Sequence, residues 1–165
     1  MTIIDSAGAT ATQDVTVTIL GTNEPVIITS GPQSGAVTEL ADTTGSAAID
    51  SAAGALNFTD ADTNDTHTVS STLVSTSGGD VPAGTQASLA TALGTVLNDS
   101  TGTGSGTIDW IFAIADGDLD FLSEGQQLTV NYDVSVSDGS TTSTQSVSVV
   151  VTGANDAVTV TGGPQ

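Results

Sequence analysis

The chain repeats part of itself at a fixed interval of 132 residues, and this periodicity constrains its fold more than any other feature. Residues 13–33 recur as residues 145–165 without a gap, and 10 of the 21 aligned positions are identical. Self-similarity at a fixed period is the sequence signature of repeat architectures. We therefore expect a portion of a tandem array. Residues 1–24 would be the last strand and linker of the preceding repeat, residues 25–157 the complete repeat, and residues 158–165 the start of the next.

The charge of the chain has one sign only. It contains 19 Asp and Glu residues, no Lys, no Arg, no Cys and one His, which gives a formal net charge of −19. Nucleic-acid binding and attachment to anionic membranes both need Lys or Arg, so we expect neither, and no apolar run approaches a membrane span. Any two carboxylates that lie close together must be separated by water, protonated, or bridged by a bound cation.

The hydrophobic pattern within the repeat has mostly a period of two. Residues 128–136 alternate apolar and polar side chains, residues 147–151 begin in the same way, and the turn-forming residues 137–140 lie between them. This arrangement predicts a β-hairpin. Shorter segments of the same kind predict further strands at residues 26–28, 36–38, 55–59, 67–73 and 107–114. We therefore expect an all-β protein, an antiparallel Ig-like or cadherin-like β-sandwich.

One segment has a different spacing. Leu89, Leu93 and Leu97 are four residues apart within residues 86–97. In a helix these three side chains share one face, so we predict a short helical insertion in the sandwich.

Several acidic and amide residues have the spacing of calcium ligands. Asp60 and Asp62 are two residues apart, so in an extended segment both side chains point to the same side. The pairs Asn23–Glu24 and Asn155–Asp156 each follow a strand, and Asp138 lies in the predicted hairpin turn. Calcium takes six to eight oxygen ligands of this kind. The alternative reading is that all of these residues are solvated turn formers.

The segment from Asp116 to Asp120 begins like an EF-hand loop but does not continue as one. Phe121 stands where the loop needs Gly, and Glu124 falls at position nine instead of twelve. We expect instead a separate calcium site that uses Asp118 or Asp120, with a solvated acidic loop as the alternative.

The linker sequences resemble those of a known family. Residues 21–25, Gly-Thr-Asn-Glu-Pro, and residues 153–157, Gly-Ala-Asn-Asp-Ala, are similar to the GTNDAP linker of VCBS repeats. The stretch from Trp110 to Gly139 is similar to the second half of such a repeat. These modules are cadherin-like sandwiches in long bacterial surface adhesins that are exported by type I secretion. The resemblance implies a stalk role, with calcium at the junctions between repeats.

The resemblance also implies a ligand set. Asp60-Ala61-Asp62 is similar to the DAD motif of cadherins, Leu119-Asp120 to the start of their LDRE motif, and Glu39 to the acid of the first strand. Asp138 corresponds to the acid that ends the penultimate strand. The linker has Gly153 and Ala157 at the first and last ligand positions of the cadherin motif, so one or two ions per junction are expected.

The sequence thus predicts a calcium-binding extender repeat of a bacterial cell-surface adhesin, an extracellular protein that supports cell adhesion and biofilm formation. The expected partners are neighbouring repeats of the same chain, together with strand exchange between molecules. We expect no enzyme, because the chain lacks Cys, a second His and a Gly-x-Ser-x-Gly motif, and we expect His67 at the surface or a strand edge. The alternative function is an adhesive domain that recognises a sugar or a peptide.

Overall fold

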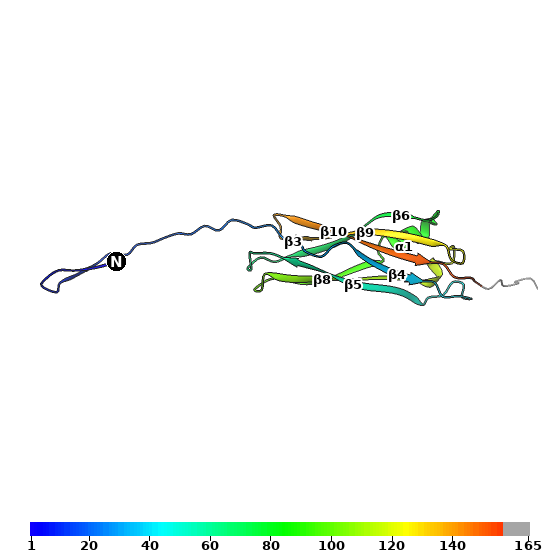
Figure 1. Cartoon of the computed structure of the whole chain (residues 1–165), viewed down its shortest axis with the longest axis horizontal. Coiled ribbons are helices and arrows are strands. Elements are labelled where there is room, and N and C mark those ends of the chain that lie inside the picture. The colour runs from blue at the N-terminus through cyan, green and yellow to red at the C-terminus, as the bar shows by residue number, and fades with distance from the viewer. Residues whose placement is uncertain (157–165) are drawn as a thin grey trace, which may run out of the picture.

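The alternating segments form two four-stranded β-sheets that pack face to face (Figure 1). The computed structural model describes residues 1–156. In the first sheet the strand order is β4 (Gln33–Thr38), β10 (Thr142–Thr152), β9 (Gln127–Ser137) and β6 (Thr68–Ser77). In the second sheet it is β3 (Ile27–Ile28), β5 (Ile49–Thr59), β8 (Ser105–Ala115) and β7 (Leu93–Asn98). The predicted β-sandwich is confirmed.

The period of two decides which side chains enter the core. In β9 every second residue from Leu128 to Val136 is buried, and the residues between them are exposed or half-buried. Strands β8 and β10 follow the same rule, with Trp110 and Phe112 inward on β8 and Val147 and Val149 inward on β10. Strands with one buried face produce this alternation, because successive side chains point to opposite faces of a sheet.

One pair of strands departs from the antiparallel prediction. Strand β4 runs parallel to β10, with Gln33 opposite Val147 and Thr38 opposite Thr152. Strand β3, a few residues earlier in the chain, pairs with β5 in the other sheet. The chain changes sheets at Gly31 and Pro32, and Pro32 has no N–H to offer a ladder at this point. Because β4 and β10 are parallel, both strands end at the same end of the sandwich.

The predicted helix is too long at its C-terminal side. Helix α1 comprises Ala83–Leu89, and the chain then forms strand β7, which pairs with β8. Leu93 and Leu97 therefore lie on a strand. A spacing of four residues places side chains on one face of a helix, but it is also a multiple of two and places them on one face of a strand. The leucine spacing alone does not distinguish these structures.

Residues 1–24 lie outside the sandwich, and this segment leaves at the β3 end (Figure 1). Strands β1 (Thr2–Ile4) and β2 (Thr10–Thr12) form a small antiparallel hairpin, and the residues from Gln13 to Val26 have no regular structure. Val15 and Val17 are 69% and 75% exposed, whereas their counterparts 132 positions later, Val147 and Val149, are fully buried in β10. The predicted start of a next repeat, residues 158–165, lies outside the described residues. Within residues 1–156, no helix is long and apolar enough to cross a membrane.

Candidate metal centre

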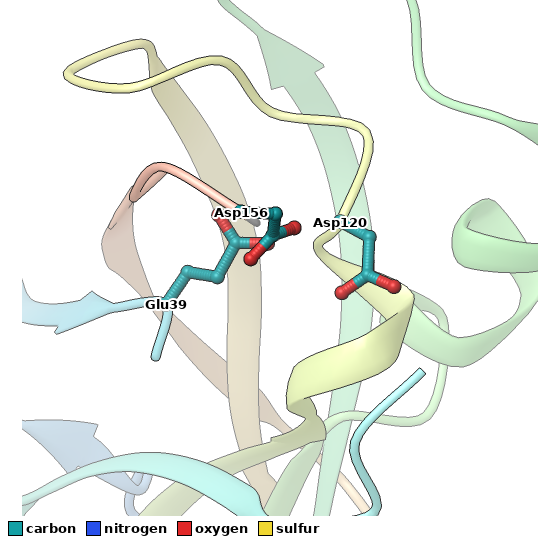
Figure 2. Close-up of side chains that lie close together, drawn as sticks. All are labelled: Glu39, Asp120 and Asp156. Carbon is teal, nitrogen blue, oxygen red and sulfur yellow. The ribbon is translucent and has the colours of Figure 1, made fainter. Parts of the chain in front are cut away.

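Three acidic side chains meet at the end of the sandwich where β4 and β10 both finish. Glu39 follows β4 directly, and Asp156 lies four residues after β10. Asp120 comes from the loop after β8, just beyond the short 3-10 helix η1 (Asp116–Asp118). One oxygen from each carboxylate lies within 4.8 Å of the other two. Figure 2 shows the carboxylates of Glu39 and Asp156 side by side, with Asp120 across from them.

Hydrogen bonds hold two of these carboxylates by one oxygen and leave the other oxygen free. Oε2 of Glu39 accepts the backbone N–H of Ala154 at 2.8 Å, and Oδ2 of Asp120 accepts the N–H of Gly45 at 2.7 Å. The second oxygens, Oε1 of Glu39 and Oδ1 of Asp120, are buried and have no hydrogen-bond partner, and Oδ1 of Asp156 is in the same state. The local fold therefore orients three unpaired oxygens in a confined space.

The electrostatics of this cluster are unfavourable without a cation. Glu39 is only 3% exposed, and its burial raises the pKa of its carboxyl group. The N–H of Ala154 works in the opposite direction, and the charges of Asp156, Asp116 and Asp120 raise the pKa further. The chain has no Lys or Arg to neutralise this group. Like-charged carboxylates in one buried place need a proton or a bound cation.

A calcium ion fits the size and the chemistry of the cluster. Calcium binds carboxylate and carbonyl oxygens at about 2.4 Å, so two ligands on opposite sides of the ion are about 4.8 Å apart. Oxygens that lie within 4.8 Å of one another are close enough to be bridged by one such ion. Calcium tolerates irregular coordination and completes its shell with water. Three preset carboxylate oxygens supply a strong part of such a shell.

A second pair of acids lies at the same end of the sandwich, and sequence reasoning missed both. Asp116 is fully buried, and its two oxygens accept the N–H of Leu40 at 2.7 Å and the hydroxyl of Thr43 at 2.9 Å. Asp50 on β5 is also buried, which raises the pKa of its carboxyl group, and the neighbouring Asp116 raises it further. One signal was available: Asp50 occupies an inward position in the alternation of β5.

The opposite end of the sandwich holds a different group of acids. Strand β10 has 11 residues, so at about 3.3 Å per residue the two ends are about 35 Å apart. At this far end Oδ2 of Asp62 accepts the N–H of Glu24 at 2.7 Å, and the side-chain amide of Asn23 donates to Oδ2 of Asp138 at 3.3 Å. The hydroxyl of Thr141 donates a hydrogen bond that lowers the pKa of Asp138, and the backbone N–H of Thr141 has a smaller effect in the same direction. These acids act as hydrogen-bond acceptors for the linker.

His67 directly precedes the edge strand β6 and lies in the interior of this far end, so the expectation of a surface histidine is wrong. Its Nε2 is 3.0 Å from Oδ2 of Asp60, and its Nδ1 is 2.7 Å from Oδ1 of Asp99. Burial alone would lower the pKa of His67, but the two carboxylates outweigh it and raise that pKa. The hydrogen bonds to His67 and Ser100 likewise lower the pKa of Asp99 against the effect of its burial. Here a histidine side chain lies between two carboxylates.

We call these two regions the Glu39 end, defined by Glu39, Asp120 and Asp156, and the His67 end, defined by His67 with Asp60 and Asp99. Of the ten residues predicted as metal ligands, the structure brings three together at the Glu39 end. Asn155 lies beside them, and its carbonyl accepts the N–H of Asp42. Asp118 lies in η1, where its carbonyl accepts the hydroxyl of Thr85. The other five predicted ligands, Asn23, Glu24, Asp60, Asp62 and Asp138, lie at the far end, and their ligand role stays a prediction.

Comparisons with protein-family models and with curated proteins gave no match. Among solved structures, the chain is similar to the endo-fucoidan hydrolase MfFcnA4 from glycoside hydrolase family 107, with 18% sequence identity and a TM-score of 0.39. The similarity covers 96% of this chain and 19% of the hydrolase chain. This chain therefore spans about a fifth of that protein's length, and a similarity this low carries no argument about activity.

Proposed function

We propose that this chain is a calcium-binding structural repeat of a bacterial cell-surface adhesin, and that it serves as an extender without enzymatic activity. The observation that carries the proposal is the Glu39 end, where three carboxylates from separate segments lie close together and each has a buried oxygen without a hydrogen-bond partner. A chain without Lys or Arg gains most from a divalent cation there. The similarity of the linkers to those of VCBS repeats supports the extracellular location and the stalk role.

The repeat period connects the two ends of the sandwich. Asn155 and Asp156 correspond to Asn23 and Glu24, 132 positions earlier. Asp156 turns its side chain back to the acids of its own repeat, whereas Asn23 and the N–H of Glu24 face forward to Asp138 and Asp62. In an array, one linker would thus contact the Glu39 end of one repeat and the His67 end of the next. Neighbouring repeats are the proposed partners.

The N-terminal hairpin also supports the tandem organisation. Strand β2, Thr10–Thr12, corresponds to Thr142–Thr144 at the start of β10, and β1 pairs with it as β9 pairs with β10. Residues 1–24 therefore have the features of a final hairpin and linker whose own sandwich precedes them. In solution, the bare side chains of Val15, Val17 and Ile19 make strand exchange between molecules a second proposed interaction.

The proposed mechanism is a calcium-dependent change in stiffness. Without calcium, the carboxylates of Glu39, Asp120 and Asp156 repel one another, and the linker that carries Asp156 is pushed away. A bound ion removes the repulsion and fixes the linker against the sandwich. At a calcium concentration of 100 times Kd, one site adds about 2.7 kcal/mol to the stability of the folded state. Extracellular modules bind calcium at about 10⁻⁴–10⁻³ M, so the site would fill after export.

An adhesive domain that binds a sugar or a peptide is the competing function. An open groove of about 650 Å³ lies near the His67 end, with amide and hydroxyl side chains such as Asn57, Asn98 and Thr107 on its walls. Phe58 also borders it but is only 1% exposed, and Trp110, Phe112 and Tyr132 are buried in the core. Sugar sites commonly use exposed aromatic rings, so these features favour the extender over the adhesive domain.

A calcium titration followed by NMR tests the proposal at named atoms. The amides of Ala154 and Gly45 donate to Glu39 and Asp120, so their signals should shift together with a single Kd, and magnesium should shift them less. The variant Glu39→Gln should weaken binding strongly. Asp133→Asn is the matched control, because Asp133 is exposed on β9 and carries the same charge. Equal affinity in both variants, or shifts confined to other residues, would reject the site.

The stiffness mechanism has its own test. In a tandem of two repeats joined by the native linker, small-angle scattering in millimolar calcium should give a longer and narrower distribution of dimensions than scattering in EGTA. The same distribution of dimensions in both solutions would contradict the stiffness mechanism, although it would not contradict calcium binding at the Glu39 end.

A further inference from the structure

The surroundings of His67 favour an imidazole that carries both of its protons. Its side chain is fully buried, and each ring nitrogen faces a carboxylate oxygen, at 3.0 Å for Asp60 and 2.7 Å for Asp99. A neutral imidazole has one donor and one acceptor nitrogen, so it would turn a lone pair toward one of these carboxylates. Only the doubly protonated ring donates to both. Apart from the N-terminal amine, this ring is the sole group in the chain that carries a positive charge.

The charge of His67 is connected to the linker by a series of hydrogen bonds. Oδ2 of Asp60 faces His67, and Oδ1 of Asp60 accepts the N–H of Asp62 at 2.8 Å. Asp62 in turn accepts the N–H of Glu24 through its own Oδ2 at 2.7 Å. The order is thus Asp99, His67, Asp60, Asp62 and Glu24. Each residue in this series orients the next, from the interior of the sandwich to the first residues outside it.

We propose that His67 is a positioning residue that fixes the entering linker without a metal ion: through Asp60 it sets the Asp62 side chain where that side chain captures the Glu24 amide. In this arrangement Asp60 serves as the partner of His67 and not as a calcium ligand. The inference goes beyond the calcium proposal and does not depend on it, because every contact in the series is made by the protein itself.

The physical reason for such an arrangement is that each group in the series restricts the conformations of the next. A linker held only by an exposed Asp would sample many orientations, because an exposed side chain loses conformational entropy when it is fixed. Asp62 is half-buried and its backbone is held by Asp60, which is itself fixed by a buried cation. Hydrogen bonds to charged groups are about twice as strong as those between neutral groups. The linker therefore leaves the sandwich in one direction.

The test is hydrogen exchange and ¹⁵N relaxation of the Glu24 amide, measured in EGTA so that calcium plays no part. In the unaltered protein this amide should be protected and ordered. Asp62→Asn should raise its exchange rate by up to roughly tenfold, because a neutral amide oxygen accepts a hydrogen bond more weakly than a carboxylate does. His67→Gln should do the same from a distance. Asp65→Asn is the matched control: it lies in the same loop, and its side chain makes none of the described hydrogen bonds.

A spectroscopic readout separates positioning from a general loss of structure. Both ring nitrogens of His67 should show the ¹⁵N shifts of an imidazolium at neutral pH. The groups that face the ring are Asp60, Asp99 and the hydroxyl of Ser100. In His67→Gln the Glu24 amide should shift and lose its protection while the amides in the centre of β9 and β10 stay unchanged, and Asp62→Asn should shift the same Glu24 amide. A neutral ring, an unprotected Glu24 amide, or an amide that is indifferent to both substitutions would overturn the inference.

Discussion

Both ends of the sandwich contain buried carboxylates, but the groups that lie next to these carboxylates differ between the two ends. Each end buries carboxylates in a chain that has no Lys or Arg. At the His67 end, the imidazolium lies between Asp60 and Asp99, and hydrogen bonds occupy the carboxylate oxygens that face inward. At the Glu39 end, three carboxylate oxygens have no partner among the described residues. The first end is satisfied by the side chains of the protein, whereas the second has buried carboxylate oxygens without a partner, and we propose that a cation binds there.

The comparison also explains why burial of acids differs in cost between the ends. A buried carboxylate whose charge is paired and hydrogen-bonded is tolerated, whereas an unpaired one raises its pKa or recruits an ion. Burial raises the pKa of Glu39, which is 3% exposed, whereas at the exposed Asp99 the hydrogen bonds from His67 and Ser100 outweigh desolvation and lower the pKa. The two carboxyl groups thus differ both in exposure and in their neighbours, which are a histidine in one case and further carboxylates in the other.

The largest expected effect comes from removing the cation of the His67 end. The variant His67→Phe keeps an aromatic ring of similar shape but leaves Asp60 buried without its partner. Breaking a buried pair in this way costs about 3 kcal/mol or more. Denaturant unfolding should show this loss equally in EGTA and in calcium. Adding Asp60→Asn and Asp99→Asn to the variant should restore part of the stability, because the unpaired charges are then gone.

The pH dependence of stability should reveal the same cation. The pKa of His67 is raised above its ordinary value of 6.5, so its contribution is fully present below pH 6.5 and is lost as the pH rises through the raised pKa. One proton limits the slope to about 1.4 kcal/mol per pH unit. Unfolding curves of the calcium-free protein should therefore show falling stability on the alkaline side. The curve for His67→Gln should be flat there; an unaltered slope in that variant would assign it to another group.

At the Glu39 end we expect a smaller change in stability, and its sign should differ between calcium-free and calcium-containing solution. In EGTA, Glu39→Gln removes a charge whose pKa is raised by burial and by Asp156, Asp116 and Asp120, so the variant should be more stable by up to about 1 kcal/mol. In calcium the same variant should be less stable than the unaltered protein, because it lacks a ligand. Calorimetry in both solutions measures the crossover. A variant that is destabilised to the same degree in both would count against a cation at this end.

The sequence was sufficient to predict the β-sandwich, because the apolar and polar alternation of its strands is a local pattern, but it did not predict the parallel pairing of β4 with β10. Alternation in residues 128–136 depends only on neighbouring residues, and it correctly predicted the buried face of β9. The leucines at 89, 93 and 97 failed as a guide to structure, because a spacing of four is compatible with a helix and with a strand. The chain resolves the ambiguity by pairing β7 with β8, a contact that no local pattern reveals.

The candidate site was predictable only in part, because residues that lie in sequence motifs can be recognised, whereas contacts between residues far apart in the sequence cannot. Glu39, Asp120 and Asp156 were named by similarity to cadherin motifs and by the duplicated linker, and the structure places their carboxylates together. His67 and Asp99 are 32 residues apart in sequence, and neither lies in a motif. Their pairing depends on how the start of β6 and the end of β7, which belong to different sheets, come together. Pairing of this kind cannot be read from residue spacing.

Thermal unfolding in EGTA and in millimolar CaCl₂, with MgCl₂ as the ionic control, tests the central claim most directly. We predict a calcium-specific rise that corresponds to about 2.7 kcal/mol per site at 100 times Kd. The rise should disappear in Glu39→Gln and remain in the exposed control Asp133→Asn. An equal rise in both variants would place the ion elsewhere. No rise in the unaltered protein would contradict the claim that the Glu39 end is a calcium site.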